Sequence, residues 1–144
     1  MSDKKIFVEG AITPSFIADS IAKHQSKHTI GAHNIFLGQV RADEFNGKKV
    51  TAIEYSTYTE MALPILSEIR ERTFATYSLT CMHIYHSLGL VKTGEICLFV
   101  FVSAPRRSEV YAATEAIVEW IKKEVPIFGK EILEDSTHSW KVNS

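Results

Sequence analysis

The chain has 144 residues, of which 45% are apolar and 23% are charged, a composition typical of a single soluble globular domain. A chain of this length buries about two-thirds of its unfolded surface, so it can fold without disulfides or structural metal ions. The 16 Lys and Arg residues nearly balance the 17 Asp and Glu residues, and this net charge of −1 argues against general nucleic-acid binding, which depends on neutralising phosphates. We therefore expect one domain over residues 1–144, with any anion site confined to a local patch.

The sequence contains no signal for a membrane, a metal or a cofactor. No stretch approaches the ~20 apolar residues of a transmembrane helix, so we expect a cytoplasmic protein that does not bind membranes. The two cysteines, Cys81 and Cys97, lie far apart and are expected to be buried thiols. The histidines form no HExxH or similar spacing, and no P-loop, GxGxxG or GxSxG motif occurs. The sequence thus predicts neither a metal site nor a bound cofactor.

The first part of the chain predicts a strand, a helix and a pair of strands. Thr13 followed by Pro14 is typical of a helix start, because threonine caps the first turn and proline suits the first helical position. The dipeptide Asn46-Gly47 is typical of a hairpin turn. The expected elements are a strand over Lys5–Glu9, a helix from Thr13-Pro14 to about Ser26, and strands over Ile30–Val40 and Val50–Ser56 joined by a loop or hairpin over Ala42–Lys48.

The middle of the chain predicts a helix followed by two strands. Apolar residues recur at broadly helical spacing over Thr59–Tyr77. Strands are then expected over Cys81–His86 and Glu95–Val102, with a connection over Gly89–Gly94. The second of these strands is apolar on both faces, so we expect it to run through the middle of a sheet.

The last third of the chain contains the clearest helical pattern. From Val110 to Val125 the apolar residues follow an i, i+3, i+4, i+7 rhythm, and Ser108 is expected to cap this helix. Pro126 ends the pattern, and an extended segment over Ile127–Leu133 precedes a polar tail. This mixture of hairpins and helices predicts an α+β fold, with the helices packed on one side of a mostly antiparallel sheet.

Several cations are candidate functional residues. Arg106 and Arg107 precede a helix, where fixed charge and free N–H groups bind anions such as phosphate, although two arginines in a loop can equally be solvated surface. Lys122 flanks the apolar stripe of the last helix, where partial burial suits a lysine to proton transfer; alternatively its stem covers apolar surface and its ammonium lies in water. Arg41 ends a strand and could reach the same site. His86 is either an acid–base group or a hydrogen-bonded imidazole at a strand end.

The order of the motifs along the chain resembles that of one family. The motifs are Gly38-Gln39-Val40-Arg41, Tyr58 with Met61, His86-Ser87-Leu88-Gly89 with Gly94-Glu95, Ser103-Ala104-Pro105-Arg106-Arg107, and Lys122 with Val125-Pro126-Ile127-Phe128-Gly129-Lys130-Glu131. In this order they resemble the catalytic (large) subunit of molybdopterin synthase, over nearly the whole chain from Ile6 to Trp140.

The resemblance implies a sulfur-transfer enzyme of molybdenum cofactor biosynthesis. Members of this family insert two sulfurs into cyclic pyranopterin monophosphate and so form the dithiolene of molybdopterin. The sulfur is carried as a thiocarboxylate on the Gly-Gly C-terminus of a small ubiquitin-like subunit. Two large subunits form a homodimer within a heterotetramer, and a neighbouring protomer can contribute to a site. Because this chain ends in Val142-Asn143-Ser144, the carrier is expected to be another chain.

The resemblance also implies roles for individual residues. Gln39 and Arg41, together with Arg106 and Arg107, are implied to bind the anionic substrate. Lys122 is implied to act in general acid–base catalysis beside the thiocarboxylate carbon. Both Lys122 and Lys130 are implied to bind substrate and to take part in catalysis.

Two positions depart from the family pattern. Arg106 stands where the family commonly has a histidine, which removes a proton-transfer group and keeps a phosphate-binding charge. Gly129 stands where the family has a lysine, and Lys130 could replace that lysine only through a local backbone change such as a bulge, because a one-residue shift turns a strand side chain to the other face. The alternatives to an active enzyme are a non-catalytic dimeric α+β module that binds a phosphorylated ligand or an acidic partner tail, and a family member that binds the carrier without turnover.

Overall fold

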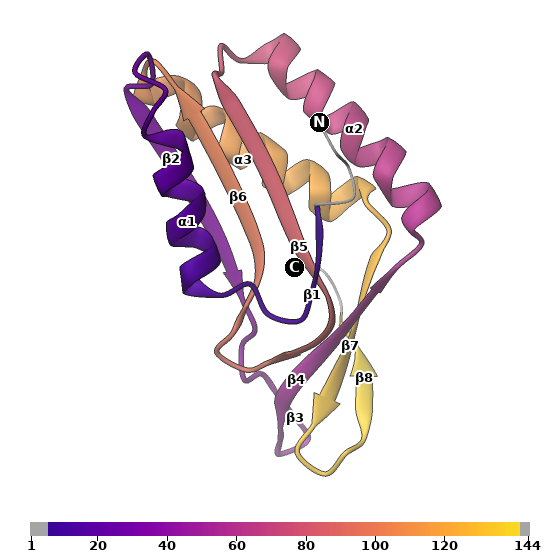
Figure 1. Cartoon of the computed structure of the whole chain (residues 1–144). Helices are drawn as coiled ribbons and strands as arrows, with labels where there is room; N and C mark the ends of the chain where they lie inside the picture. Colours follow the sequence, from indigo (N-terminus) through magenta and orange to yellow (C-terminus); the bar gives the residue numbers. More distant parts are fainter. Residues whose placement is uncertain (1–5, 142–144) are drawn as a thin grey trace.

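The structure, a computed structural model, describes residues 6–141 and contains eight strands and three helices within them (Figure 1). The predicted strand start at Lys5 and the terminal residues 142–144 lie outside the described residues. In chain order the elements are β1 (Phe7–Glu9), α1 (Pro14–His24), β2 (Ala32–Gln39), β3 (Glu44–Phe45), β4 (Lys48–Thr57), α2 (Thr59–Thr76), β5 (Cys81–Lys92), β6 (Ile96–Ala104), α3 (Arg107–Glu124), β7 (Ile127–Leu133) and β8 (His138–Trp140).

The strands form one mostly antiparallel sheet. Its main path runs β2-β6-β5-β4-β7-β8, while β1 pairs with β5 and β3 pairs with β4. Every neighbouring pair among the described strands is antiparallel except β1 with β5, which is parallel. β6 lies between β2 and β5 and is buried on both faces, as its apolar sequence predicted.

Helices cover both faces of the sheet. α2 and α3 share one face, where Leu98, Val100 and Val102 of β6 join the main core. α1 lies on the opposite face, over Phe99 and Phe101 (Figure 1). The predicted one-sided packing therefore holds for α2 and α3 and not for α1, because the large apolar side chains that alternate along β6 need cover on both sides. None of the three helices in the described part of the chain is long and apolar enough to cross a membrane.

Two local predictions are confirmed at the level of single hydrogen bonds and dihedral angles. Thr13 is the N-cap of α1, and its Oγ1 accepts a hydrogen bond of 3.2 Å from the backbone N–H of Phe16. Asn46 and Gly47 both have positive φ, 51° and 78°, as a type I′ turn between β3 and β4 requires.

Three local predictions differ from the structure. β5 runs on through the expected connection, because Gly89, at a φ of 82°, allows the strand to leave β6 and pair with β4. Arg106 is the N-cap of α3, so Ser108 lies in the first turn rather than at the cap. The polar tail forms β8, which pairs with β7.

The pairing of β4 with β7 positions the segment that follows α3. Val125 is the C-cap of α3, and β7 begins at Ile127. The antiparallel register then sets Tyr55 opposite Gly129 and Glu54 opposite Lys130. As a result, the last turn of α3 and the first residues of β7 lie near the end of β2.

Candidate functional site

A cavity of about 690 Å³ opens where α3 ends, between β2, β4 and β7. The segment after β2 and the last turn of α3 contribute most of the charged groups of this cavity. β8 lies at the cavity's edge, where it contributes Trp140. Cations outnumber anions in this lining, so the cavity favours an anionic ligand. The polar and charged residues of the lining are Gln39, Arg41, Asp43, Tyr55, His86, Cys97, Lys122, Lys123, Glu131 and Lys141.

Three of the predicted site residues line this cavity. Gln39 is the last residue of β2 and Arg41 follows it, whereas Lys122 lies in the last turn of α3. Arg41 is 70% exposed and its Nε lies 3.0 Å from Oδ1 of Asp43. Because such an exposed ion pair contributes little free energy, Arg41 can turn to another anion at small cost.

Lys130 lies outside the cavity. Its Nζ is 3.2 Å from Oε1 of Glu54, the residue directly opposite it on β4. The pairing of β4 with β7 has no register shift from Ile127 to Ile132, so no bulge turns Lys130 inward. Strand alternation instead directs Gly129 and Glu131 to the cavity.

Arg106 and Arg107 also lie away from the cavity, at the other end of α3. Both are exposed, Arg106 as the N-cap and Arg107 as the first helical residue. At ~1.5 Å per residue, Arg107 and Lys122 are separated by roughly 22 Å along the helix axis. A single copy of the chain therefore does not bring all the predicted cations together.

His86 and Tyr55 form the buried wall of the cavity, with ring centroids 5.1 Å apart. His86 donates a hydrogen bond of 2.8 Å from Nδ1 to the carbonyl of Ser87. Burial, together with the charge of Lys122, lowers the pKa of His86 to about 4, so the neutral form is the one present near pH 7. Burial and then the neighbouring Cys97 raise the pKa of Tyr55. The hydrogen-bonded imidazole expected for His86 is present, and it also faces the cavity.

Lys141 is a cation of the cavity that sequence reasoning missed. Its backbone N–H donates a hydrogen bond of 2.8 Å to the carbonyl of Gly129. A Cβ atom at Gly129 would lie 3.6 Å from Cβ of Lys141, so the lysine stem passes over the glycine. Its charge also acts on Glu131, where it opposes the rise in carboxyl pKa that burial causes. Only the pairing of β8 with β7 reveals this position, which explains why no sequence signal pointed to it.

Comparison with known proteins identifies the family. The model of the family described as "MoaE protein" matches residues 12–124. The chain belongs to this family. A curated relative from Bacillus subtilis, "Molybdopterin synthase catalytic subunit", is 36% identical over 117 residues, which are 81% of this chain and 74% of the relative. The chain spans only 31–33% of the length of several Drosophila relatives with the same name. The resemblance predicted from the motifs is thus confirmed.

Solved structures agree with this assignment. Molybdopterin synthase from Staphylococcus aureus matches with a TM-score of 0.83 and 30% identity, over 99% of this chain and 98% of that one. A structure of the complex of subunits 1 and 2 of the Helicobacter pylori molybdopterin-converting factor matches with a TM-score of 0.78 over 93% of this chain and 87% of that one, at 17% identity, and supports the fold alone. The predicted α+β class is confirmed.

Proposed function

We propose that this chain is the catalytic subunit of a molybdopterin synthase and works in the cytoplasm. It transfers two sulfurs from the C-terminal thiocarboxylate of a small ubiquitin-like carrier to cyclic pyranopterin monophosphate, which forms the dithiolene of molybdopterin. The observation that carries this proposal is the cationic cavity at the end of α3, which brings together Gln39 and Arg41 from one motif and Lys122 from another motif of a MoaE-family chain. The sequence similarity to proteins named as this subunit supports the same activity.

The chemistry explains why the cavity needs positive charge and a proton donor. In each transfer the thiocarboxylate sulfur forms a bond to a substrate carbon and displaces an oxygen there, which leaves with the phosphate or as water. Water then hydrolyses the bond between that sulfur and the carrier's acyl carbon, and the carrier is released as a carboxylate. Oxygen anions develop on both molecules, and nearby ammonium and guanidinium groups stabilise them. We assign proton transfer beside the acyl carbon to Lys122, and phosphate binding to Arg41 with Gln39.

Lys141 is the second lysine that we assign to this reaction, in place of Lys130. Gly129 leaves no side chain at the inward position of β7, and the stem of Lys141, the residue after β8, covers that position. Lys130 faces away and pairs with Glu54. The ammonium of Lys141 can therefore contact the substrate, whereas Lys130 could do so only if β7 contained a bulge.

The rim of the cavity fits the tail of a carrier subunit. Leu37, Phe128 and Trp140 are large apolar side chains of the lining that are 41%, 41% and 58% exposed. Exposed apolar groups beside a polar pocket are typical of a protein-binding surface. An extended Gly-Gly tail with an anionic end could cross this rim and place its thiocarboxylate beside Lys122.

Arg106 and Arg107 fit the proposal through a second copy of the chain. They lie at the far end of α3, so they can reach a substrate held near Lys122 only if another protomer brings them there. We propose a homodimer within a heterotetramer, in which these arginines bind the phosphate of a substrate held in the neighbouring cavity.

The decisive experiment combines the purified chain with a thiocarboxylated carrier and cyclic pyranopterin monophosphate. Product is detected by mass and by oxidation to its fluorescent derivative. Lys122→Ala should lower turnover by about 10²–10⁴-fold while carrier binding remains. Lys23→Ala, a change in the last turn of α1 far from the cavity, is the matched control and should leave turnover unchanged. A stable complex without any product from the unaltered chain would instead identify a carrier-binding scaffold.

A further inference from the structure

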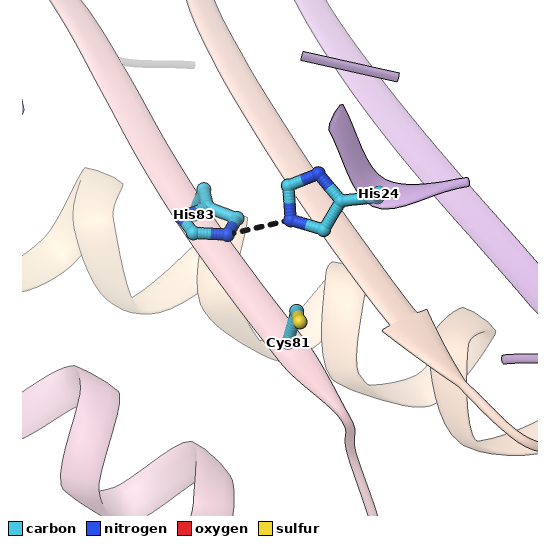
Figure 2. Close-up of side chains that lie close together, drawn as sticks. All are labelled: His24, Cys81 and His83. Atoms are coloured by element: carbon cyan, nitrogen blue, oxygen red, sulfur yellow. Dashed lines mark hydrogen bonds between the residues drawn. The ribbon is translucent and has the colours of Figure 1, made fainter. Parts of the chain in front are cut away.

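A second cluster of reactive side chains lies on the α1 face of the sheet, outside the cavity. His24 is the last residue of α1, whereas Cys81 and His83 are the first and third residues of β5 (Figure 2). Nε2 of His24 and Nε2 of His83 are 2.9 Å apart. One ligand atom from each of the three residues lies within 4.8 Å of the others. Three donors that metals favour therefore converge from two separate elements.

The surroundings of His24 hold its ring in the orientation that a metal ligand needs. Its Nδ1 lies 2.7 Å from the carbonyl of Ser20, which can only accept a hydrogen bond. Nδ1 therefore carries the proton, and the lone pair of the neutral ring is on Nε2, facing His83 and Cys81. Histidine ligands in metal sites are commonly fixed in this way by a backbone carbonyl.

His83 presents a ring nitrogen to the same point. Its Nε2 lies 2.9 Å from Nε2 of His24, so the two imidazoles from α1 and β5 meet edge to edge. The thiol of Cys81 is buried and accepts a hydrogen bond of 2.9 Å from Nζ of Lys27, so this ammonium lies directly beside the sulfur.

We propose that His24, Cys81 and His83 form a binding site for a thiophilic divalent cation, of which Zn²⁺ is the type. Two imidazole nitrogens and one thiolate are donors that zinc prefers, and three protein ligands leave a fourth position open to water. Tetrahedral zinc at ~2.0–2.3 Å from its ligands sets them about 3.3–3.6 Å apart. In the structure the two histidine nitrogens are closer than this, at 2.9 Å, and the three ligand atoms lie within 4.8 Å of one another. Small side-chain rotations would therefore complete the site. The set contains no oxygen ligand, which excludes Mg²⁺ and Ca²⁺.

Such an ion would join the end of α1 to the start of β5. The sequence predicted no metal site because the ligands come from distant segments and only Cys81 and His83 share a strand.

Two nearby cations would repel the bound ion. Lys27 contacts the sulfur, and the guanidinium of Arg70 donates to the carbonyl of Met82 beside it. We therefore expect the site to bind metal more tightly when Lys27 is replaced by a neutral residue.

Cobalt titration tests the site directly. Full-length protein without a histidine tag is stripped with a chelator and titrated with Co²⁺, which shows a thiolate charge-transfer band when sulfur coordinates it, and Zn²⁺ is then added to displace it. Cys81→Ser should abolish the band, and His24→Gln should weaken binding by about tenfold or more. Cys97→Ser and His28→Gln are the matched controls, because they remove the other buried thiol and an exposed histidine near α1. Lys27→Met should tighten binding.

Thermal unfolding gives a second readout that does not depend on enzyme activity. A bound ion stabilises the folded state, so Zn²⁺ should raise the Tm of the unaltered chain and of the Cys97→Ser control but not of His24→Gln. If Cys81→Ser proves unstable, His24→Gln can carry the test instead, because it alters only a partly buried residue at a helix end. Circular dichroism checks that the His24→Gln variant is folded. Cobalt binding without a thiolate band, or equal binding by His24→Gln and the unaltered chain, would show adventitious metal only and would overturn the proposal.

Discussion

The two lysines near Gly129 give the sharpest test of the proposed site. For a phosphate held within about 6 Å of the Lys141 ammonium, an effective dielectric constant of about 20 gives an attraction of about 3 kcal/mol. Solvent at the mouth of the cavity reduces this to about 1–2 kcal/mol. Lys141→Ala should therefore lower kcat/KM about 5- to 30-fold. Lys130→Ala removes only the pair with Glu54, whose side chains are 32% and 51% exposed, and should cost at most about 1 kcal/mol of stability with turnover retained.

The assay compares the two variants at a saturating concentration of the carrier subunit. kcat/KM for the pterin substrate is measured by product fluorescence, and urea unfolding confirms that each variant is folded. The variants remove the same charge from the two sides of one strand pair, so each serves as the control for the other. If both variants lost activity equally, or if only Lys130→Ala lost activity, the assignment of Lys141 to the cavity and of Lys130 to the opposite face of β7 would be wrong.

Two further predictions concern stability. The free energy of unfolding should fall as the pH drops from about 6.5 to about 4, because His86, whose pKa burial lowers to about 4, takes up its proton only on unfolding. The loss should be on the order of 2 kcal/mol by about pH 5 in urea titrations with a chelator present, and His86→Asn should remove this share of it. Gly89→Ala should destabilise more than Gly10→Ala, since both glycines have positive φ (82° and 79°) but only a Cβ at Gly89 would lie 3.1 Å from the Glu9 carboxylate oxygens. Each change should cost about 1–2 kcal/mol from the backbone alone, and equal losses would contradict the role of that contact.

Features set by local patterns could be predicted from the sequence. The periodicity from Val110 to Val125 gave α3, and Thr13-Pro14 gave the start of α1, because helix faces and caps depend on residues a few positions apart. The order of motifs singled out Gln39, Arg41 and Lys122 as candidates, and the structure places all three in the lining of one cavity.

Features set by strand pairing could not be predicted in the same way. Lys141 reaches the cavity only because β8 pairs with β7, and the polar tail shows no alternation that would reveal this pairing. The extension of β5 through Gly89 depends on β4 as a new partner. His24 meets Cys81 only because α1 covers the face of the sheet opposite α2 and α3, a choice that depends on tertiary packing.

The separation of Arg107 from Lys122 is different, because the helical rise alone implies it. Lys122 lies fifteen helical steps after Arg107, or roughly 22 Å along the axis, and that distance follows from the predicted helix without any structure. A single small substrate cannot contact both ends of such a helix, so a site that uses both arginine and lysine must join two protomers. The two departures from the family pattern therefore lie in different parts of the proposed site. In the proposed dimer Arg106 would act on a neighbour's substrate, whereas Gly129 and Lys141 would act within their own cavity, so each departure could be compensated without affecting the other.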